Sequence, residues 1–144
     1  DFWYGDMNTD FGKYENLADK TTLLFAVSGV DPKPMSPNSY WYKYYTYLPK
    51  EEGVDDGQLI QTGEKVYEAN PFGLYNMHGN VSEWTRSDYV PYPYNPKTKL
   101  TSDHKVVRGG SYIERPKFST AYARKAYYPY QRVFNVGFRV IIED

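Results

Sequence analysis

The chain has 144 residues and a formal net charge of −1, from 17 Lys and Arg against 18 Asp and Glu. This length suits a single domain spanning residues 1–144. The charge balance argues against the basic field that nucleic-acid or anionic-membrane binding uses, and no run approaches the roughly 20 apolar residues of a membrane span. Because Cys is absent, disulfides, thiolate metal sites and Cys nucleophiles are excluded.

Tyrosine is abundant, with 17 Tyr beside 7 Phe and 3 Trp. A Tyr side chain combines a large apolar ring with a hydroxyl that needs a partner. Such a composition suits a loop-rich domain in which rings cover the core. It equally suits an exposed aromatic surface that binds sugar or peptide, and the sequence leaves both interpretations open.

Local patterns predict many loops and a few strands. Proline removes a backbone donor and restricts its neighbour, so two loops are expected at the proline clusters Pro32, Pro34, Pro37 and Pro91, Pro93, Pro96. Residues 76–80 resemble a tight turn, and residues 81–84 a short extended piece. Alternating or β-branched runs predict three strands at residues 105–112, 120–128 and 136–143. The last becomes continuously apolar, as in a central strand, and helical periodicity is scarce.

Two polar clusters have the composition of a calcium site. Calcium takes about six to eight oxygen ligands, often carboxylate, amide and backbone carbonyl together. Asn76 and Glu83 flank Gly79, which permits a sharp turn, and Asp55 and Asp56 precede Gly57. Asx-Gly pairs also form turns without any metal, and neither cluster matches the EF-hand loop. Calcium and metal-free turns are both retained as interpretations.

The order of several motifs resembles the C-terminal part of the formylglycine-generating enzyme family, also called the sulfatase-modifying factor family. These motifs are "ENLAD", "NPFGLYNMHGNVSEW", "VVRGGSY", "AR" and "NVGFRV", spread from about Trp3 to Val140. The resemblance implies an α+β fold, a variant of the C-type lectin fold with sparse regular structure and long ordered loops. Family members usually carry a further N-terminal portion, so we expect this chain to be a fragment or a cleavage product.

The resemblance also implies two structural calcium ions. By position, one would be bound by Asn16, the Leu17 carbonyl, Asp56 and the Gln58 carbonyl. The other would be bound by Asn76, the Gly79 carbonyl, the Val81 carbonyl and Glu83.

The positions that carry the family's redox chemistry differ here. The enzymes hold copper with two cysteines, and those positions are Glu114 and Ser119 in this chain. Carboxylate and hydroxyl are hard oxygen ligands, whereas Cu(I) selects soft thiolates. Ser82 replaces the usual aromatic residue beside the oxygen pocket, although Ser111 matches the serine of that pocket. We therefore expect no formylglycine synthesis and no catalytic residues.

Other candidates for chemistry are weak. Iron-binding relatives use histidines on a separate domain, whereas His78 and His104 lack a second His at ligand spacing and are expected to be ordinary surface or turn histidines. Glu83 and Asp88 are a conceivable carboxylate pair. Arginines are expected to pair with carboxylates or carbonyls inside the fold, namely Arg108, Arg124 and Arg139.

The first functional hypothesis is a non-catalytic, calcium-stabilised recognition or scaffold module. Its expected surface joins the loop at residues 89–99 to residues 112–130 and presents Tyr122, Tyr127, Tyr128 and Tyr130. The expected partner is a protein or peptide, with carbohydrate as an alternative and no nucleic acid. Many relatives in this family are exported, so the resemblance suggests an extracytoplasmic location, periplasmic or secreted, where calcium is abundant.

Two alternatives remain open. One is a metal-dependent oxidoreductase, or a subunit of one, completed by a missing segment or a partner chain. Glu114, Ser119 and Asp103 would then be oxygen ligands of a harder metal. The other is retroelement-diversified ligand binding through residues 122–135.

Overall fold

The computed structural model describes residues 1–28, 31–34, 51–63, 65–95, 97 and 103–142. Regular structure is sparse, as expected, and it fits an α+β class. The helices in this part of the chain are all short 3₁₀-helices: η1 (Phe11–Lys13), η2 (Lys20–Leu24) and η3 (Pro116–Phe118). The strands are β1 (Phe25–Ser28), β2 (Asp31–Pro34), β3 (Ser82–Asp88), β4 (Lys105–Arg108), β5 (Lys125–Tyr127) and β6 (Val136–Gly137).

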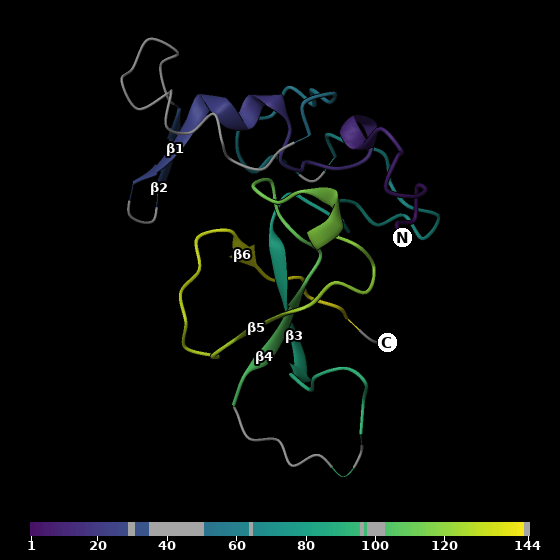
Figure 1. The fold of residues 1–144 in the computed structure, drawn as a ribbon, viewed down its shortest axis with the longest axis vertical. Coiled ribbons are helices and arrows are strands. Elements are labelled where there is room, and N and C mark those ends of the chain that lie inside the picture. The colour runs from purple at the N-terminus through teal and green to yellow at the C-terminus, as the bar shows by residue number, and fades with distance from the viewer. Residues whose placement is uncertain (29–30, 35–50, 64, 96, 98–102, 143–144) are drawn as a thin grey trace.

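Four strands form the main sheet, in the order β5-β4-β3-β6 (Figure 1). β3 pairs antiparallel with β4, and β4 pairs antiparallel with β5. β6 pairs parallel with β3 over two residue pairs, Ser82 with Val136 and Glu83 with Gly137. β3 is therefore the strand that joins the C-terminal region to the rest of the sheet.

The strand predictions were right in location and wrong in extent. The extended piece expected at residues 81–84 is the longer strand β3. The strand expected at residues 105–112 ends at Arg108, because Gly109 and Gly110 have φ of 89° and 74°, which end an L-residue strand. Of residues 120–128, only β5 is a strand, since Ala123 N–H donates to the Thr120 carbonyl in a turn.

The prediction of a central strand at residues 136–143 was wrong. Only Val136–Gly137 pair with β3, and residue 143 lies outside the described residues. The apolar run beyond β6 is largely exposed, with exposed fractions of 77% for Phe138, 72% for Val140, 79% for Ile141 and 86% for Ile142. Continuous apolar character was mistaken for burial, because periodicity does not report whether a partner strand is present.

A separate two-stranded hairpin, β1 with β2, stands away from the main sheet (Figure 1). The first proline cluster was expected to be loop, yet Pro32 and Pro34 lie in β2 and pair with Val27 and Phe25. β2 has a single partner strand, and an edge strand tolerates proline. Pro37 and Pro96 lie outside the described residues.

The core combines a few apolar side chains with many polar ones. Phe11, Leu17, Val107 and Tyr112 are each at most 2% exposed. Buried polar residues surround them: Glu15, Asn16, Asp19, Ser82, Ser111 and Ser119. Beside this core, an aromatic cluster forms from Phe2, Trp3, Tyr4, Tyr14 and His78, with ring centroids 4.9 to 6.0 Å apart. These rings pack against one another, which agrees with the packing interpretation of the Tyr-rich composition for this part of the chain.

Candidate functional site

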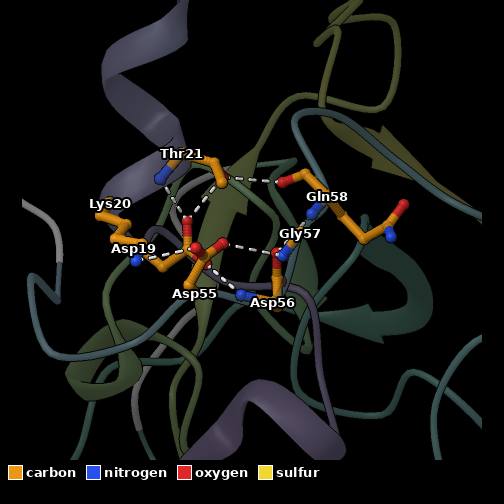
Figure 2. Close-up of polar contacts among 7 residues, drawn as sticks. All are labelled: Asp19, Lys20, Thr21, Asp55, Asp56, Gly57 and Gln58. Carbon is orange, nitrogen blue, oxygen red and sulfur yellow. Dashed lines mark hydrogen bonds and ion pairs between the residues drawn. The ribbon is translucent and has the colours of Figure 1, made fainter.

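The first predicted calcium cluster is a compact set of polar contacts between two loops (Figure 2). The Asp56 N–H donates to Asp19 Oδ2 at 2.6 Å, and the Gln58 N–H donates to Asp56 Oδ1 at 2.7 Å. The Thr21 hydroxyl, which has one proton to donate, lies 2.6 Å from Asp19 Oδ1 and 2.9 Å from the Gln58 carbonyl oxygen. Two of the predicted ligands, Asp56 and Gln58, are therefore side by side.

The Asp56 carboxyl is held in an unfavourable environment for its charge. Burial raises its pKa to about 7, and the nearby Asp19 carboxylate adds to that rise, while the Gln58 N–H and the Tyr67 hydroxyl act in the opposite direction. The Tyr67 hydroxyl donates to Asp56 Oδ2 at 3.0 Å. The neighbouring Asp55 is different, because it is exposed and pairs with Lys20 at 2.8 Å.

Asn16, another predicted ligand, contacts the chain just after Gln58. Its Nδ2 donates to the Ile60 carbonyl at 2.8 Å, which fixes the amide, and its Oδ1 is buried without a hydrogen-bond partner in the described part of the chain. Leu17 is 1% exposed beside it. An orphaned amide oxygen and a half-buried carboxyl whose pKa is raised are the kinds of oxygen group that suit a hard cation.

The carboxyl that precedes Asn16 is also buried. Burial raises the pKa of Glu15 to about 7, and hydrogen bonds from Trp3 and from the backbone of His78 and Met77 partly oppose that rise. The Trp3 indole N–H donates to Glu15 Oε1 at 3.2 Å. Across the described residues, no three acidic or histidine side chains gather closely enough to hold a metal by themselves. A calcium ion here would depend on amide and carbonyl oxygens.

Sequence reasoning missed Asp19 as a member of this cluster. Its Oδ1 accepts from the Thr21 N–H at 2.8 Å, the local Asx turn that an Asp-x-Thr sequence favours. That local signal was present in "ADKT", but it gave no sign that Asp19 Oδ2 would contact Asp56, which is 37 residues further along the chain.

The second predicted site begins with a tight turn, as expected. Asn76 and Asn80 have φ of 56° and 65°, the left-handed region that Asn tolerates. Gly79 lies against Asn16, where an added Cβ would stand 3.0 Å from the Asn16 carbonyl carbon and 3.1 Å from its nitrogen. The Asn80 N–H donates to the Asn16 carbonyl at 2.8 Å. The two predicted sites are therefore neighbours around the backbone of Asn16.

Glu83, however, already faces a positive charge. Arg139 Nη2 donates to Glu83 Oε1 at 2.7 Å, and Arg139 Nε lies 3.0 and 3.1 Å from the two carboxylate oxygens. Arg139 Nη2 also donates to the Tyr75 carbonyl at 2.9 Å. Beside this pair is an open depression of about 520 Å³, lined by Lys65, Gly73, Leu74, Tyr75, Asn76, Glu83, Phe138 and Arg139. The guanidinium supplies charge that calcium would otherwise supply.

The suggested pairing of Glu83 with Asp88 was wrong. The two residues occupy opposite ends of β3, where Glu83 pairs with Arg139 and Asp88 forms an ion pair with Lys105. No shared proton is available between carboxylates so far apart.

The positions of the family's copper ligands are occupied by an internal ion pair and a buried hydroxyl. Glu114 Oε1 is paired with the ammonium of Lys125. Burial lowers the pKa of Lys125 to about 8. Ser119 is fully buried, and the space that a side chain at Gly110 would need is filled by the Ser119 hydroxyl. Asp103 is exposed and precedes β4, at the end opposite to Ser111, so it does not join them.

Ser82 and Ser111 are both buried beside this position. The Ser82 N–H donates to the Asn135 carbonyl at 2.9 Å, and Asn135 Nδ2 donates to the Ser111 hydroxyl at 2.7 Å. His78 Nδ1 lies 2.7 Å from the Ser119 carbonyl. His78 is 7% exposed, so it is a turn histidine but not a surface one, and burial lowers its pKa.

The predicted tyrosine surface is present in part. Tyr122, Tyr128 and Tyr130 are 61%, 40% and 79% exposed. Tyr128 and Tyr130 stack with centroids 5.3 Å apart, and the His104 ring lies 3.9 Å from Tyr128. Tyr127 is only half-exposed, with its ring against Trp84. Tyr112 is buried in the core, which limits the surface to the segment around β5.

The two ends of this surface come from different segments. Tyr92 and Tyr94, in the loop after β3, are 67% and 66% exposed.

Of the arginines expected to pair within the fold, Arg108 donates to the Ala121 carbonyl and Arg139 pairs with Glu83. Arg124 does not follow that expectation, because in the described residues it contacts tyrosine rings and no carboxylate or carbonyl.

The fold and the site define a small α+β domain in which polar loops surround a mixed sheet. Residues 18–144 match the model of the sulfatase-modifying factor enzyme 1-like domain. The chain therefore belongs to that family.

Individual relatives agree with this assignment. The chain is 33% identical over 101 residues to the formylglycine-generating enzyme of Streptomyces coelicolor, covering 64% of this chain and 32% of that protein. It is 37% identical over 101 residues to the formylglycine-generating enzyme of Mus musculus, covering 64% of this chain and 27% of that protein. The chain thus spans about a third or less of the length of these relatives.

Among solved structures, PvdO from Pseudomonas aeruginosa is similar, with a TM-score of 0.50 and 28% identity. The match covers 60% of this chain and 36% of PvdO. No helix in the described part of the chain has the length and apolar composition that crossing a bilayer requires.

Proposed function

We propose that this chain is a non-catalytic recognition or scaffold module on the formylglycine-generating-enzyme fold, stabilised by calcium. One observation carries the proposal: Glu114, at a position where the resemblance assigns a copper thiolate, is neutralised by the ammonium of Lys125. A cation brought to Glu114 would be repelled by Lys125, and the chain contains no Cys to offer a thiolate.

The exposed tyrosines around β5 support the recognition part of the proposal. Tyr side chains carry large contact area with few rotatable bonds, and they are enriched at binding surfaces. Tyr122, Tyr128 and Tyr130 leave 40% or more of their surface in solvent. Their partner would be a protein or peptide.

Calcium would be held first by the cluster around Asn16 and Asp56. The orphaned Asn16 oxygen and the half-buried Asp56 carboxyl support that position. Glu83 is a weaker candidate ligand because Arg139 already pairs with it. Calcium would link loops that have little regular structure between them.

The finer fold description and the location belong to the same proposal. Sparse strands joined by long ordered loops support a variant of the C-type lectin fold. An extracytoplasmic location would supply calcium at concentrations that fill weak sites. Detection of the native protein only in the cytoplasmic fraction of its cells would contradict that location.

The enzymatic side of the proposal is tested with a sulfatase-derived peptide that contains the substrate cysteine. The wild-type chain, loaded with copper, is expected to leave this peptide unchanged in a mass-spectrometric assay. The Glu114→Cys, Ser119→Cys variant is also expected to be inactive, because Lys125 remains beside position 114 and Ser82 remains in the oxygen pocket. Formylglycine formed by either protein would overturn the proposal.

A second candidate is a metal-dependent oxidoreductase, or a subunit of one, completed by a further segment or a partner chain. It is favoured by Glu114 Oε2 and the Ser119 hydroxyl, which are buried and lack a hydrogen-bond partner among the described residues. Elemental analysis after calcium removal distinguishes the two candidates, since stoichiometric transition metal would favour this one.

A further inference from the structure

Arg124 is held face-on by tyrosine rings. It immediately precedes β5, and the loop that follows β3 brings Tyr89 and Tyr92 to it. The guanidinium carbon lies 3.6 Å from the centroid of the Tyr92 ring and 5.2 Å from that of the Tyr89 ring. Two segments about 30 residues apart in the chain thus meet at one cation.

The hydrogen-bond donors of Arg124 have no acceptor in the described part of the chain. Two other arginines are paired with carboxylates: Arg115 Nε donates to Glu51 Oε1 at 2.8 Å, and Arg139 pairs with Glu83. The residues of the nearby loop that the structure does not describe, 96 and 98–102, include no Asp or Glu in the sequence. That loop therefore cannot supply a carboxylate to Arg124.

This arrangement fixes a charge without neutralising it. A ring attracts the face of a guanidinium, with an energy of about 0.5–1 kcal/mol at exposed sites. The five N–H donors lie around the edge of the guanidinium plane and form a fork that matches a carboxylate. Stacking on Tyr92 therefore orients Arg124 and leaves this edge available.

The surroundings of Arg124 suit a peptide partner. Tyr92 and Tyr94 are 67% and 66% exposed, and they offer apolar faces with hydroxyls at their tips. Lys105, in the neighbouring strand β4, is already paired with Asp88. A chain of net charge −1 does not offer the basic stripe that nucleic acid needs.

We propose that Arg124, stacked on Tyr92 and Tyr89, binds the side-chain carboxylate of an acidic peptide segment whose neighbouring residues pack on Tyr92 and Tyr94. This inference rests on the proposed recognition function and names the chemistry of its partner. A carboxylate is expected because its charge complements that of Arg124. The exposed tyrosines favour a peptide in which aromatic or apolar residues flank the acidic residue.

Fluorescence anisotropy with two labelled peptides tests the inference. The first peptide is Gly-Tyr-Glu-Glu-Tyr-Gly, and the second has Gln in place of both Glu residues. The wild-type chain is expected to bind the Glu peptide about tenfold more tightly, the factor that one charge-assisted hydrogen-bonded pair supplies. Arg124→Gln is expected to remove this preference. Arg124→Lys is expected to keep part of it, since a point charge lacks the fork.

Arg132→Gln is the matched control, because it removes the same charge as Arg124→Gln. Arg132 is exposed and makes no ion pair within the described residues. It is expected to keep the tenfold preference, and unchanged melting temperatures show that each variant is folded. Equal binding of both peptides by the wild type, an equal loss in Arg132→Gln, or no binding of either peptide overturns the inference. The formylglycine assay does not involve Arg124. Failure of the proposed function would therefore be detected separately from failure of this inference.

Discussion

Gly79 illustrates how single residues set the geometry of the polar centre. Its Cα rests on the backbone of Asn16, and the next N–H, from Asn80, donates to the Asn16 carbonyl at 2.8 Å. The Asn80 amide then bonds residue 62 in both directions, at 2.8 Å to the Thr62 N–H and 3.2 Å to its carbonyl. The Asn80 backbone and side chain thus join three loops, and the missing side chain of Gly79 permits their close approach.

Gly79→Ala is expected to destabilise the fold by about 1–3 kcal/mol, the usual cost of overpacking. The added methyl would stand 3.0 Å from the Asn16 carbonyl carbon, which is backbone and cannot rotate away. Urea unfolding followed by tryptophan fluorescence measures the loss. Gly53→Ala is the control, because an added Cβ there meets nothing within 4 Å and is expected to change stability by less than about 0.5 kcal/mol. Equal stability of the two variants would contradict the described packing.

At the scale of elements, side-chain contacts link loops that lie far apart in the sequence. The segment around η2 contacts residues 55–58 through Asp19 and Thr21, and β3 contacts the segment after β6 through Glu83 and Arg139. Long loops in compact domains are usually ordered by such specific contacts. Removing a link between loops should therefore affect stability more than its surface position suggests.

Calcium binding at the first loop pair is expected to raise the melting temperature by several degrees. Saturation at about 100 times Kd adds about 2.7 kcal/mol to the free energy of unfolding. Differential scanning calorimetry in calcium and in chelator measures the shift for the wild type. Asp56→Asn is expected to lose it. Asp55→Asn is expected to keep it, since Asp55 is exposed and pairs with Lys20. A wild-type melting temperature that is the same in both buffers would remove the calcium proposal.

The link between β3 and the C-terminal segment is measured by a double-mutant cycle. Glu83→Gln, Arg139→Gln and the double variant are expected to give a coupling free energy of about 1 kcal/mol, the upper end for partly exposed pairs with good geometry. Both side chains are partly exposed, at 23% and 31%, which limits the value. Additive effects in urea unfolding would mean that the pair does not form in solution.

At the scale of the whole molecule, apolar surface is distributed unevenly. The core contains Phe11, Leu17 and Val107, whereas Phe138, Val140, Ile141 and Ile142 are each more than 70% exposed. Large contiguous apolar patches are uncommon on isolated soluble domains. These four side chains lie within residues 138–142, and we call them the C-terminal patch.

The C-terminal patch is expected to bind the dye 8-anilinonaphthalene-1-sulfonate in the folded chain. Val140→Thr together with Ile142→Thr is expected to reduce the dye fluorescence by roughly half, because two of the four exposed side chains become more polar. Val66→Thr serves as the control, since Val66 is 51% exposed and lies outside the patch. Unchanged fluorescence in the double variant would show that these side chains are covered in solution.

The sequence by itself determined the family, the α+β class, the scarcity of regular structure and the turn at residues 76–80. These follow from features that are local or ordered along the chain: asparagines that tolerate the left-handed region, scarce helical periodicity, and the five motifs in family order. The sequence also implied that Asp56 and Gln58 lie in the same loop, because they are two residues apart in the chain.

Only the tertiary structure decided which distant groups meet. The Asp19–Asp56 contact, the Glu114–Lys125 and Glu83–Arg139 ion pairs, and the stacking of Arg124 on Tyr92 join residues that lie far apart in sequence. The same reason explains the wrong central strand at residues 136–143. Periodicity reports the character of a segment, whereas burial and charge compensation depend on what the fold brings against it.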